Sequence, residues 1–567
     1  MTIQKPKKST IAILNLDASI SIYQEALRFI SYSLFMHNTN VIHLGCHGAL
    51  QRCVNINALP EIVRSSDIEA KKEFLCAYCR KQQNKIFRHQ SHAATLNLDK
   101  LNIDQEEFIT KIGQNLLNDP RAVSIIAEKY HEIDICKIAF FDFSIAGKMS
   151  PESLLTEEEQ RRFIEHIADL FVLINFLKRV SVSCDIGLVL YVNGNYSQNS
   201  LARSVLQNNC REFISVEFQF SSVKARNRIF FEKDRLVLLP KWPSISALDS
   251  HYKLRLSDLK AGLHIMKNRF LGNDYNSYTK PSSKSVNAEF DSFRNKYKTI
   301  LSYFSCSTDE IYSHIVTHGV KIDQTFYPDQ YELIHDFIVN ARDDIGYVIR
   351  VHPRLAPNKR DRVVSREIAE INKYLDMARA KKNFFIIEAS NPLSSYYVLL
   401  KSDLIIVAWS TIALEAMIAG KPAIALFPLD CVYPIRELCK QPKDVNEYRR
   451  ILRGEIPSSI ITIDDINLMR WVAMVYSALS HSIPSPREST YSLPVRLYNF
   501  LYRRLLSSNL LYRIAMIPAA MSSTAVNTGI LNRHIRQLQN RTVRDDLSAS
   551  RQELQAFRKK IRDIILH

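Results

Sequence analysis

The chain has 567 residues, too many for a single hydrophobic core, so two domains with extra segments are expected. Hydrophobic residues make up 46% of it and charged residues 23%, as in an ordinary globular protein, and the net charge of +17 favours anionic partners such as nucleic acid, acidic lipid head groups or phosphorylated substrates. We find no secretory signal, no apolar run of about 18 residues, and no disulfide framework among the ten cysteines. A cytoplasmic protein is therefore expected.

The first half of the chain alternates strand-like and helix-like segments. β-Branched runs at 10–14 and 40–44 flank an amphipathic segment at 23–35, which predicts a βαβ unit and a parallel sheet. Further strands are expected at 138–141, 186–192 and 213–218, with a long helix at 161–180. These segments predict a first Rossmann-like domain in residues 1–265.

A second α/β series follows a polar linker that we place at 266–297. Strands are expected at 299–304, 346–351, 384–387, 404–407 and 423–427, with helices at 331–341, 393–401 and 411–419 between them. A second Rossmann-like domain is thus expected at 298–480, followed by a helical basic tail at 481–567 with a long helix within 532–566. The predicted fold class is α/β and GT-B-like, with two Rossmann-like domains about a central cleft.

The segment 403–426 (DLIIVAWSTIALEAMIAGKPAIAL) has the pattern of a strand, a tight turn, a helix, a Gly-Lys-Pro break and a second strand. Ser410 and Thr411 fall where the strand ends and the helix begins, and backbone N–H groups and hydroxyls there favour a phosphate. Glu415, one turn further on, is placed to accept hydrogen bonds from ribose hydroxyls. An ordinary βαβ unit with a serine N-cap has the same pattern, so the segment alone leaves both interpretations open.

Two other polar segments follow strands of the same series. Arg350, His352 and Arg354 (Arg-Val-His-Pro-Arg) end the strand at 346–351, at the sheet edge where open α/β sheets bind ligands, and paired cations suit a phosphate or carboxylate. Ser307 lies in Ser-Cys-Ser-Thr-Asp-Glu after the strand at 299–304 and offers a hydroxyl to a phosphate or base. Solvated arginines at a strand end and a helix cap are the alternatives.

The order of these segments, S-x-S-x-D-E, then R-x-H-P, then S-D-L-I-I-x-x-x-S-T-x-x-L-E-A-x-x-x-G-K-P, resembles the bacterial capsule polysaccharide biosynthesis proteins over residues 298–480. These are GT-B enzymes that include the Kdo transferases of capsule assembly. The resemblance implies a site for a nucleotide-activated sugar donor, made by Ser307, Arg350, His352, Arg354, Ser410, Thr411 and Glu415.

Inverting transfer also needs a base for the acceptor hydroxyl, and in GT-B enzymes it usually comes from the N-terminal domain. Candidates at the expected strand ends are Asp17, Asp142 and Glu217, with His47 as a further one. Each also fits a helix cap or a loop carboxylate. No metal is expected for the chemistry, because helix dipoles and cationic side chains can offset the charge of the leaving phosphate.

Four of the cysteines cluster with the spacing C-x6-C-x22-C-x2-C: Cys46, Cys53, Cys76 and Cys79. A C-x2-C pair is a good half-site for tetrahedral zinc, but the C-x6-C half is irregular. Structural zinc, unligated thiols, and an iron–sulfur or redox pair therefore stay open.

Together these features predict a glycosyltransferase that moves a sugar from a nucleotide-activated donor onto a lipid-linked or growing surface polysaccharide. The resemblance makes CMP-Kdo the first choice of donor. The alternatives are a CDP-polyol glycerophosphotransferase-like enzyme and a catalytically silent GT-B scaffold. Nucleic acid is not an expected partner, because the sequence has no basic stripe with interleaved aromatics. The basic tail, with 501–517 as an interfacial helix, is expected on the anionic inner face of the plasma membrane, or else packed on the N-terminal domain.

Overall fold

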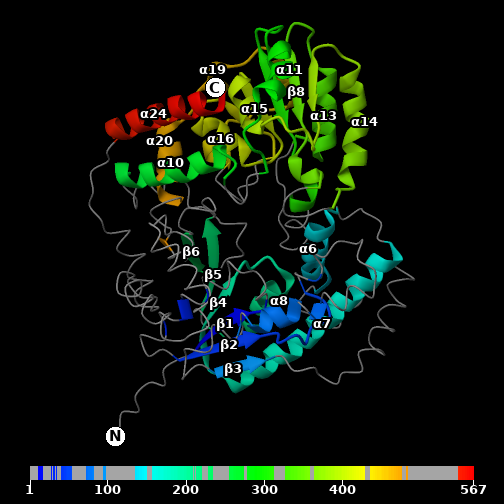
Figure 1. The fold of residues 1–567 in the computed structure, drawn as a ribbon, viewed down its shortest axis with the longest axis vertical. Helices are drawn as coiled ribbons and strands as arrows, with labels where there is room; N and C mark the ends of the chain where they lie inside the picture. Colours follow the sequence, from blue (N-terminus) through cyan, green and yellow to red (C-terminus); the bar gives the residue numbers. More distant parts are fainter. Residues whose placement is uncertain are drawn as a thin grey trace.

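Two mostly parallel β-sheets, one from each half of the chain, organise the computed structural model (Figure 1). It describes residues 10–16, 27, 30, 31, 34, 40–53, 56, 72, 73, 75–81, 83, 94–97, 135–149, 156–207, 210, 212–219, 228–233, 254–273, 278–311, 326–357, 363–427, 435–475, 481–482 and 547–566. No helix within these residues has the length and hydropathy needed to cross a bilayer. The segment 501–517 lies outside them.

The N-terminal sheet has seven strands in the order β12-β6-β5-β4-β1-β2-β3. Its parallel part consists of β1 (Thr10–Asn15), β2 (Val41–Gly45), β3 (Ala94–Asn97), β4 (Ile186–Val192) and β5 (Glu212–Gln219). Two further strands extend one edge: β6 (Arg228–Lys233) pairs antiparallel with β5, and β12 (His481–Ser482) pairs antiparallel with β6. Counted along the chain, the five parallel strands have the order 3-2-1-4-5 of a doubly wound fold.

The helices whose bounds are described in this half are α6 (Ile135–Gly147), α7 (Glu157–Ser183) and α8 (Ser197–Leu206). Helix α7 begins at a capping box, in which Thr156 and Glu159 satisfy each other's backbone N–H groups. The expected helix at 23–35 is described only at four buried positions, all helical, which recur at helical spacing: Leu27, Ile30, Ser31 and Leu34.

The strand expected at 138–141 is wrong, because these residues lie inside helix α6. The segment Ile-Ala-Phe-Phe is a short apolar run, and such a run does not distinguish a buried strand from a helix buried on most sides. Here Ile138, Ala139 and Phe141 are all buried. The third strand along the chain is β3 instead, which lies at the edge of the sheet beside β2.

The C-terminal sheet has five strands, β7 (Ile300–Phe304), β8 (Gly346–Arg350), β9 (Phe384–Ile387), β10 (Leu404–Val407) and β11 (Ala423–Ala425). All pair in parallel in the order β11-β10-β7-β8-β9, which is again 3-2-1-4-5 along the chain. Every residue of β7, β8, β10 and β11 is buried, as expected of parallel strands covered on both faces. The predicted class, α/β with two Rossmann-like domains, is confirmed by these strand orders.

The helices around this sheet are α10 (Leu256–Phe270), α11 (Lys284–Arg294), α13 (Gln330–Val339), α14 (Glu367–Arg379), α15 (Ser395–Lys401), α16 (Ile412–Ile418), α17 (Ile435–Leu438), α18 (Val445–Leu452), α19 (Ser458–Ile461), α20 (Asp465–Ala473) and α24 (Leu547–Leu566), with a 3-10 turn, η1 (Pro353–Leu355). The expected linker, 266–297, therefore contains the end of α10 and all of α11. Phe270 and Phe290 from these two helices are buried in the core of the C-terminal half.

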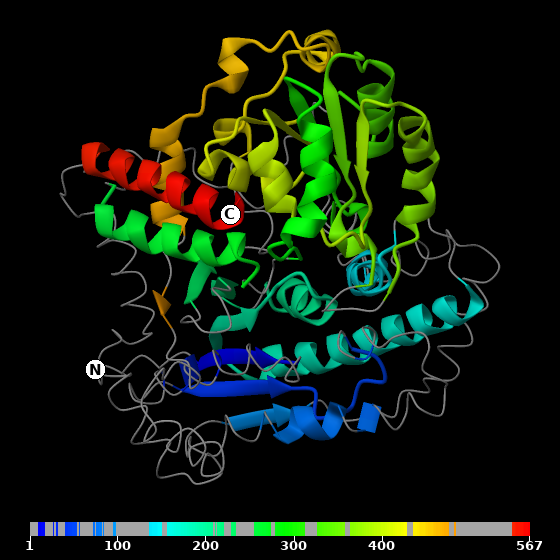
Figure 2. The same cartoon turned by 45° about the horizontal axis from the view of Figure 1, so that its top comes forward.

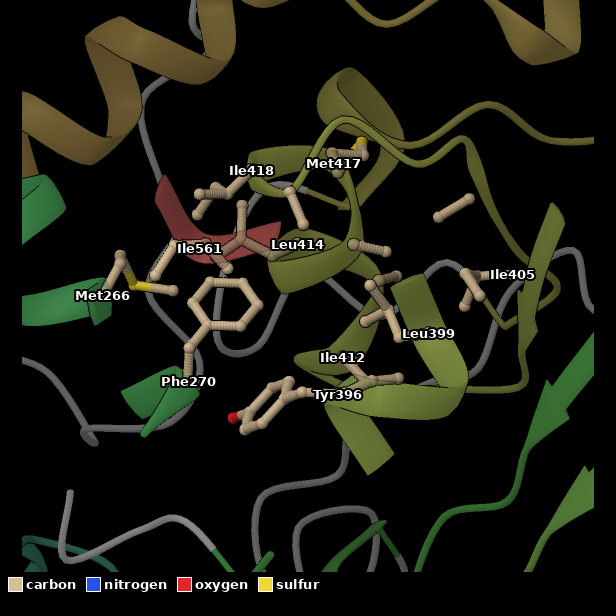
Figure 3. Close-up of a cluster of buried hydrophobic side chains, with 14 of the residues drawn as sticks. Met266, Phe270, Tyr396, Leu399, Ile405, Ile412, Leu414, Met417, Ile418 and Ile561 are labelled. Carbon is tan, nitrogen blue, oxygen red and sulfur yellow. The ribbon is translucent and has the colours of Figure 1, made fainter. Parts of the chain in front are cut away.

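The C-terminal helix α24 packs beside α10 on the C-terminal domain (Figure 2). Its Ile561 meets Met266 and Phe270 of α10, and Leu414 and Ile418 of α16, in one apolar cluster (Figure 3). The helix expected within 532–566 is thus present at 547–566, and it covers the core of the C-terminal domain.

Arg558 fixes α24 to the end of α16. Its guanidinium donates to the carbonyl oxygens of Met417 (2.9 Å) and Ile418 (3.2 Å) and pairs with Asp465 of α20 (2.6 Å). Gly420, with φ +81°, lies against it, and a Cβ there would come within 3.1 Å of the Arg558 side chain. A cation at a helix C-terminus is favourable, so Arg558 caps α16 from a distant part of the chain.

Replacing this cap should destabilise the C-terminal domain. We expect Arg558→Met to lower the free energy of unfolding by about 2–4 kcal/mol, because two carbonyl oxygens and one carboxylate lose a charged donor. Urea unfolding followed by tryptophan fluorescence measures the loss, since Trp471 lies in the same core. Arg551→Met, on the exposed side of α24, is the control and should change stability by less than about 0.5 kcal/mol. Equal stability of the two variants would contradict the assigned role.

Candidate functional site

The carboxyl ends of β7, β8 and β10 bring the three motif segments to one edge of the C-terminal sheet. Strand β7 lies between β8 and β10, with Phe304 beside Arg350 on one side and Val407 on the other. The chain winds in opposite directions from β7, so the gap between β7 and β10 is the topological switch point. In open α/β sheets ligands bind outside the carboxyl ends of the strands at this point.

The β10–α16 turn carries Ser410 and Thr411, both half-buried. Ser410 Oγ accepts from the N–H of Ile412 (3.3 Å), and Thr411 is the N-cap residue of α16 without a side-chain cap bond. Trp409 packs against the apolar clusters on both faces of the sheet, which fixes the turn. The turn thus holds two hydroxyls beside the switch point.

Glu415 is buried on α16 and forms an ion pair with Arg269 of α10, with 3.2 Å between Oε1 and Nη1. Arg269 was not among the predicted site residues, because it lies in the segment assigned to the end of the first domain and the linker. The sequence signals only a basic last turn of α10. The pair fixes the Glu415 carboxylate one turn from Ser410 and Thr411.

Arg350 is buried, and its guanidinium points into the protein. It donates to the Glu388 carbonyl (2.5 Å), the Asn391 carbonyl (3.4 Å) and Ser395 Oγ (3.2 Å). Burial lowers the pKa of Arg350 to about 10, while nearby Glu388 opposes the shift. These bonds fix the connection between β9 and α15.

His352 is half-buried just after β8. The ring nitrogen Nδ1 accepts from the backbone N–H of Arg354 (3.2 Å), and the backbone N–H of His352 donates to Ser305 Oγ (2.8 Å). For the first bond Nδ1 has to be unprotonated, so the neutral ring carries its proton on Nε2. The ring packs edge-on against Tyr278, with centroids 5.6 Å apart. Tyr278 lies in the expected linker and was not predicted.

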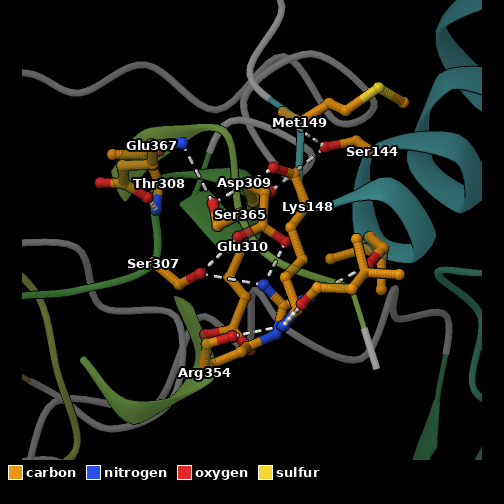
Figure 4. A network of polar contacts seen from close by, with 12 residues as sticks. Ser144, Lys148, Met149, Ser307, Thr308, Asp309, Glu310, Arg354, Ser365 and Glu367 are labelled. Carbon is orange, nitrogen blue, oxygen red and sulfur yellow. Dashed lines mark hydrogen bonds and ion pairs between the residues drawn. The ribbon is translucent and has the colours of Figure 1, made fainter. Parts of the chain in front are cut away.

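Arg354 is buried in a polar network with Ser307 and Asp309 (Figure 4). It donates to Ser307 Oγ (2.9 Å), pairs with Asp309, and lies 3.4 Å from Glu310. Burial opposes its charge, but the two carboxylates outweigh this and raise the pKa of Arg354. Its other amino group donates to the carbonyl of Ile145 in α6 (3.0 Å), across the domain boundary.

Of the three carboxylates proposed as the base, only Asp142 has a described side chain. Asp17 lies outside the described residues, and Glu217 lies in β5 opposite Phe230, with its side chain not described. Asp142 is fully buried within α6, not at a strand end. It accepts from the N–H (3.1 Å) and Oγ (2.5 Å) of Ser197, whose Oγ lies 3.0 Å from His166 Nε2. Asp142 therefore caps α8, whose own N-cap residue makes no side-chain capping bond to the helix.

The four clustered cysteines are all half-buried. The Cys46 loop lies near Cys76, because a Cβ at Gly48 would be 3.5 Å from the Cβ of Cys76. Burial raises the pKa of the Cys46 thiol. Within the described part of the chain, no three His, Cys, Asp or Glu side chains are arranged to hold a metal ion, and structural zinc stays a prediction.

No protein-family model and no curated relative matches the chain. Among solved structures, UDP-GlcNAc 2-epimerase from Methanocaldococcus jannaschii, in complex with UDP-GlcNAc and UDP, aligns over 87% of this chain and 99% of its own, with 11% identity and a TM-score of 0.27. The calicheamicin glycosyltransferase CalG4 aligns over 89% and 100%, with 10% identity and a TM-score of 0.23. At TM-scores this low the alignments carry no argument about function, and the fold assignment rests on the strand orders.

A buried carboxylate, Glu367 of α14, supports the segment after β7. It accepts from the N–H of Thr308 (3.0 Å) and from the amide of Gln330. Burial raises the pKa of Glu367 from 4.5 to about 7, and Asp309 adds to the shift. Between these values the folded protein holds a proton that the unfolded chain releases, so this group's contribution to stability is lost as the pH rises toward 7.

We therefore expect Glu367→Gln to flatten the pH dependence of stability. Melting temperatures of the parent should fall more steeply than those of the variant between about pH 5 and pH 7, because the variant has no carboxyl to titrate there. Burial also raises the pKa of Asp169 to about 7, but Asp169 is present in both proteins and cancels in the difference. Glu370→Gln, on the exposed side of the same helix, is the control. Parallel curves for the parent and Glu367→Gln would refute the assignment.

Proposed function

We propose that this chain is a glycosyltransferase that binds a nucleotide-activated sugar at the carboxyl edge of β7, β8 and β10. The observation that carries the proposal is that all three motif segments follow the carboxyl ends of adjacent strands, β10, β7 and β8, at the edge that holds the switch point of a Rossmann-ordered sheet. The acceptor hydroxyl would attack the anomeric carbon, and the nucleotide phosphate would leave with the bonding electrons.

In this proposal Ser410 and Thr411 bind the phosphate, and Glu415, fixed by Arg269, accepts from the ribose hydroxyls. The Nε2–H of His352 donates to an oxygen of the leaving phosphate or sugar. Arg350 and Arg354, together with Ser307, support these groups indirectly, because their side chains bond within the protein.

This distribution of charge favours a donor with a single phosphate. Arg350 and Arg354, predicted as phosphate ligands, are engaged by backbone carbonyls or carboxylates. The phosphate ligands that remain in this proposal, Ser410, Thr411 and the neutral ring of His352, carry no charge. A nucleoside monophosphate leaves with less charge than a nucleoside diphosphate and needs fewer cations to offset it. We therefore propose a CMP-linked sugar such as CMP-Kdo, no catalytic metal, and a surface-glycan acceptor, lipid-linked and met at an anionic membrane surface. The base for that acceptor is assigned to the N-terminal domain.

Thermal stabilisation by nucleotides tests the donor site. A ligand at about a hundred times its dissociation constant adds roughly 2.7 kcal/mol, which is visible as a shift in melting temperature. We expect a shift with CMP that exceeds those with CDP, UDP and GDP. The affinity for CMP should fall at least about tenfold in Ser410→Ala and in Glu415→Ala, which is a loss of roughly 1.4 kcal/mol or more of binding free energy.

Thr462→Ala, a hydroxyl deletion on the exposed surface of the same domain, is the matched control and should bind CMP as the parent does. A stronger response to CDP or UDP would keep the site and contradict the monophosphate donor. A folded protein that responds to none of the four nucleotides would overturn the proposed function.

A further inference from the structure

Helix α6 stands between the two sheets, and its last turn enters the C-terminal domain (Figures 1 and 4). The helix ends in a Schellman-type turn, in which the N–H of Met149 donates to the carbonyl of Ser144 (3.0 Å). Lys148 occupies the left-handed position of this turn, with φ +49°. Glycine is the usual residue there, because a Cβ is strained at positive φ.

The Lys148 side chain is 2% exposed although lysine is rarely buried. Its ammonium group donates to three carbonyl oxygens of the C-terminal domain, those of Arg354, Ala356 (3.1 Å) and Val363 (2.6 Å). Three donors thus meet three acceptors, which offsets the cost of burying the charge. Arg354 and Ala356 precede residues 357–362 and Val363 follows them, so one ammonium group bonds to the backbone on both sides of this stretch.

The C-terminal domain returns contacts to the same turn. Arg354 donates to the carbonyl of Ile145, and Ser365 Oγ donates to the carbonyl of Lys148 (3.3 Å). A cation beside the carbonyl end of α6 is favourable. Further out, Arg366 pairs with Glu159 at the start of α7. Each domain therefore satisfies carbonyl oxygens of the other.

We propose that Lys148 is a positioning residue that clamps the N-terminal domain onto the segments after β7 and β8. Through the carbonyl of Arg354 it holds the backbone that carries His352 and Arg354, and through Arg354 it reaches Ser307 and Asp309. The clamp accounts for a lysine in a glycine position. It goes beyond the proposed function, because it fixes the two domains whatever ligand the site takes.

The test is the melting temperature of Lys148→Gly in the full-length protein without nucleotide. A lysine that is merely tolerated at this position and a lysine that joins the two domains predict changes of opposite sign. If the lysine is merely tolerated, glycine relieves the strained backbone and the melting temperature rises. If Lys148 is a clamp, glycine removes the ammonium and the melting temperature falls. A rise would overturn the proposal, whatever the nucleotide titrations show.

Hydrogen exchange locates the effect. In Lys148→Met, amides in peptides covering 352–357 and 363–368 should exchange at least about tenfold faster, while those of α13 stay unchanged. Lys382→Met, an exposed lysine of the same domain, should leave both regions as in the parent. Should neither Lys148 variant fold, Arg366→Met removes the outer, half-exposed contact and should give a smaller increase at 363–368. Unchanged exchange at 363–368 in Arg366→Met would count against the clamp.

Discussion

The buried ion pair between Arg354 and Asp309 constrains the arrangement of the whole site. Two charges taken from water need further hydrogen bonds on every side to be tolerated. Arg354 finds them in Ser307 after β7 and in the Ile145 carbonyl of α6. The carboxyl ends of β7 and β8 and the end of α6 therefore have to meet at one point. That meeting places the N-terminal domain against the edge of the sheet where the motif segments lie.

Most of the sheet architecture could be predicted from the sequence, because parallel strands buried on both faces are continuous apolar runs between helical segments. The runs at 186–192 and 404–407 are strands at those bounds. The run at 138–141 is equally apolar but lies in α6, where burial on most sides removes the helical periodicity. Local pattern therefore fails where a helix is buried on most of its sides, as α6 is in the core of the N-terminal half.

The site was predictable only where it is contiguous in sequence. Ser410 and His352 follow β10 and β8 as the βαβ pattern predicts, and Glu415 lies one turn into α16, while their binding of a donor stays a prediction. Their partners Arg269 and Tyr278 come from a stretch that resembles a linker, and no spacing rule connects them to the motifs. The motif arginines were assigned to a ligand, since the sequence does not show that backbone carbonyls already surround Arg350.

In the basic tail, the charge of the sequence likewise does not show which residues are already bonded within the protein. In sequence, the positive residues of 547–566 suggest an anionic partner, but one of them, Arg558, is bonded to the carbonyl end of α16 and to Asp465. The apolar side of α24 is buried against α10 and α16, while Arg551, Lys559, Lys560 and Arg562 are exposed. The helix is thus first a component of the C-terminal core. Only its outer face is available to a partner, and net charge alone does not separate these two uses.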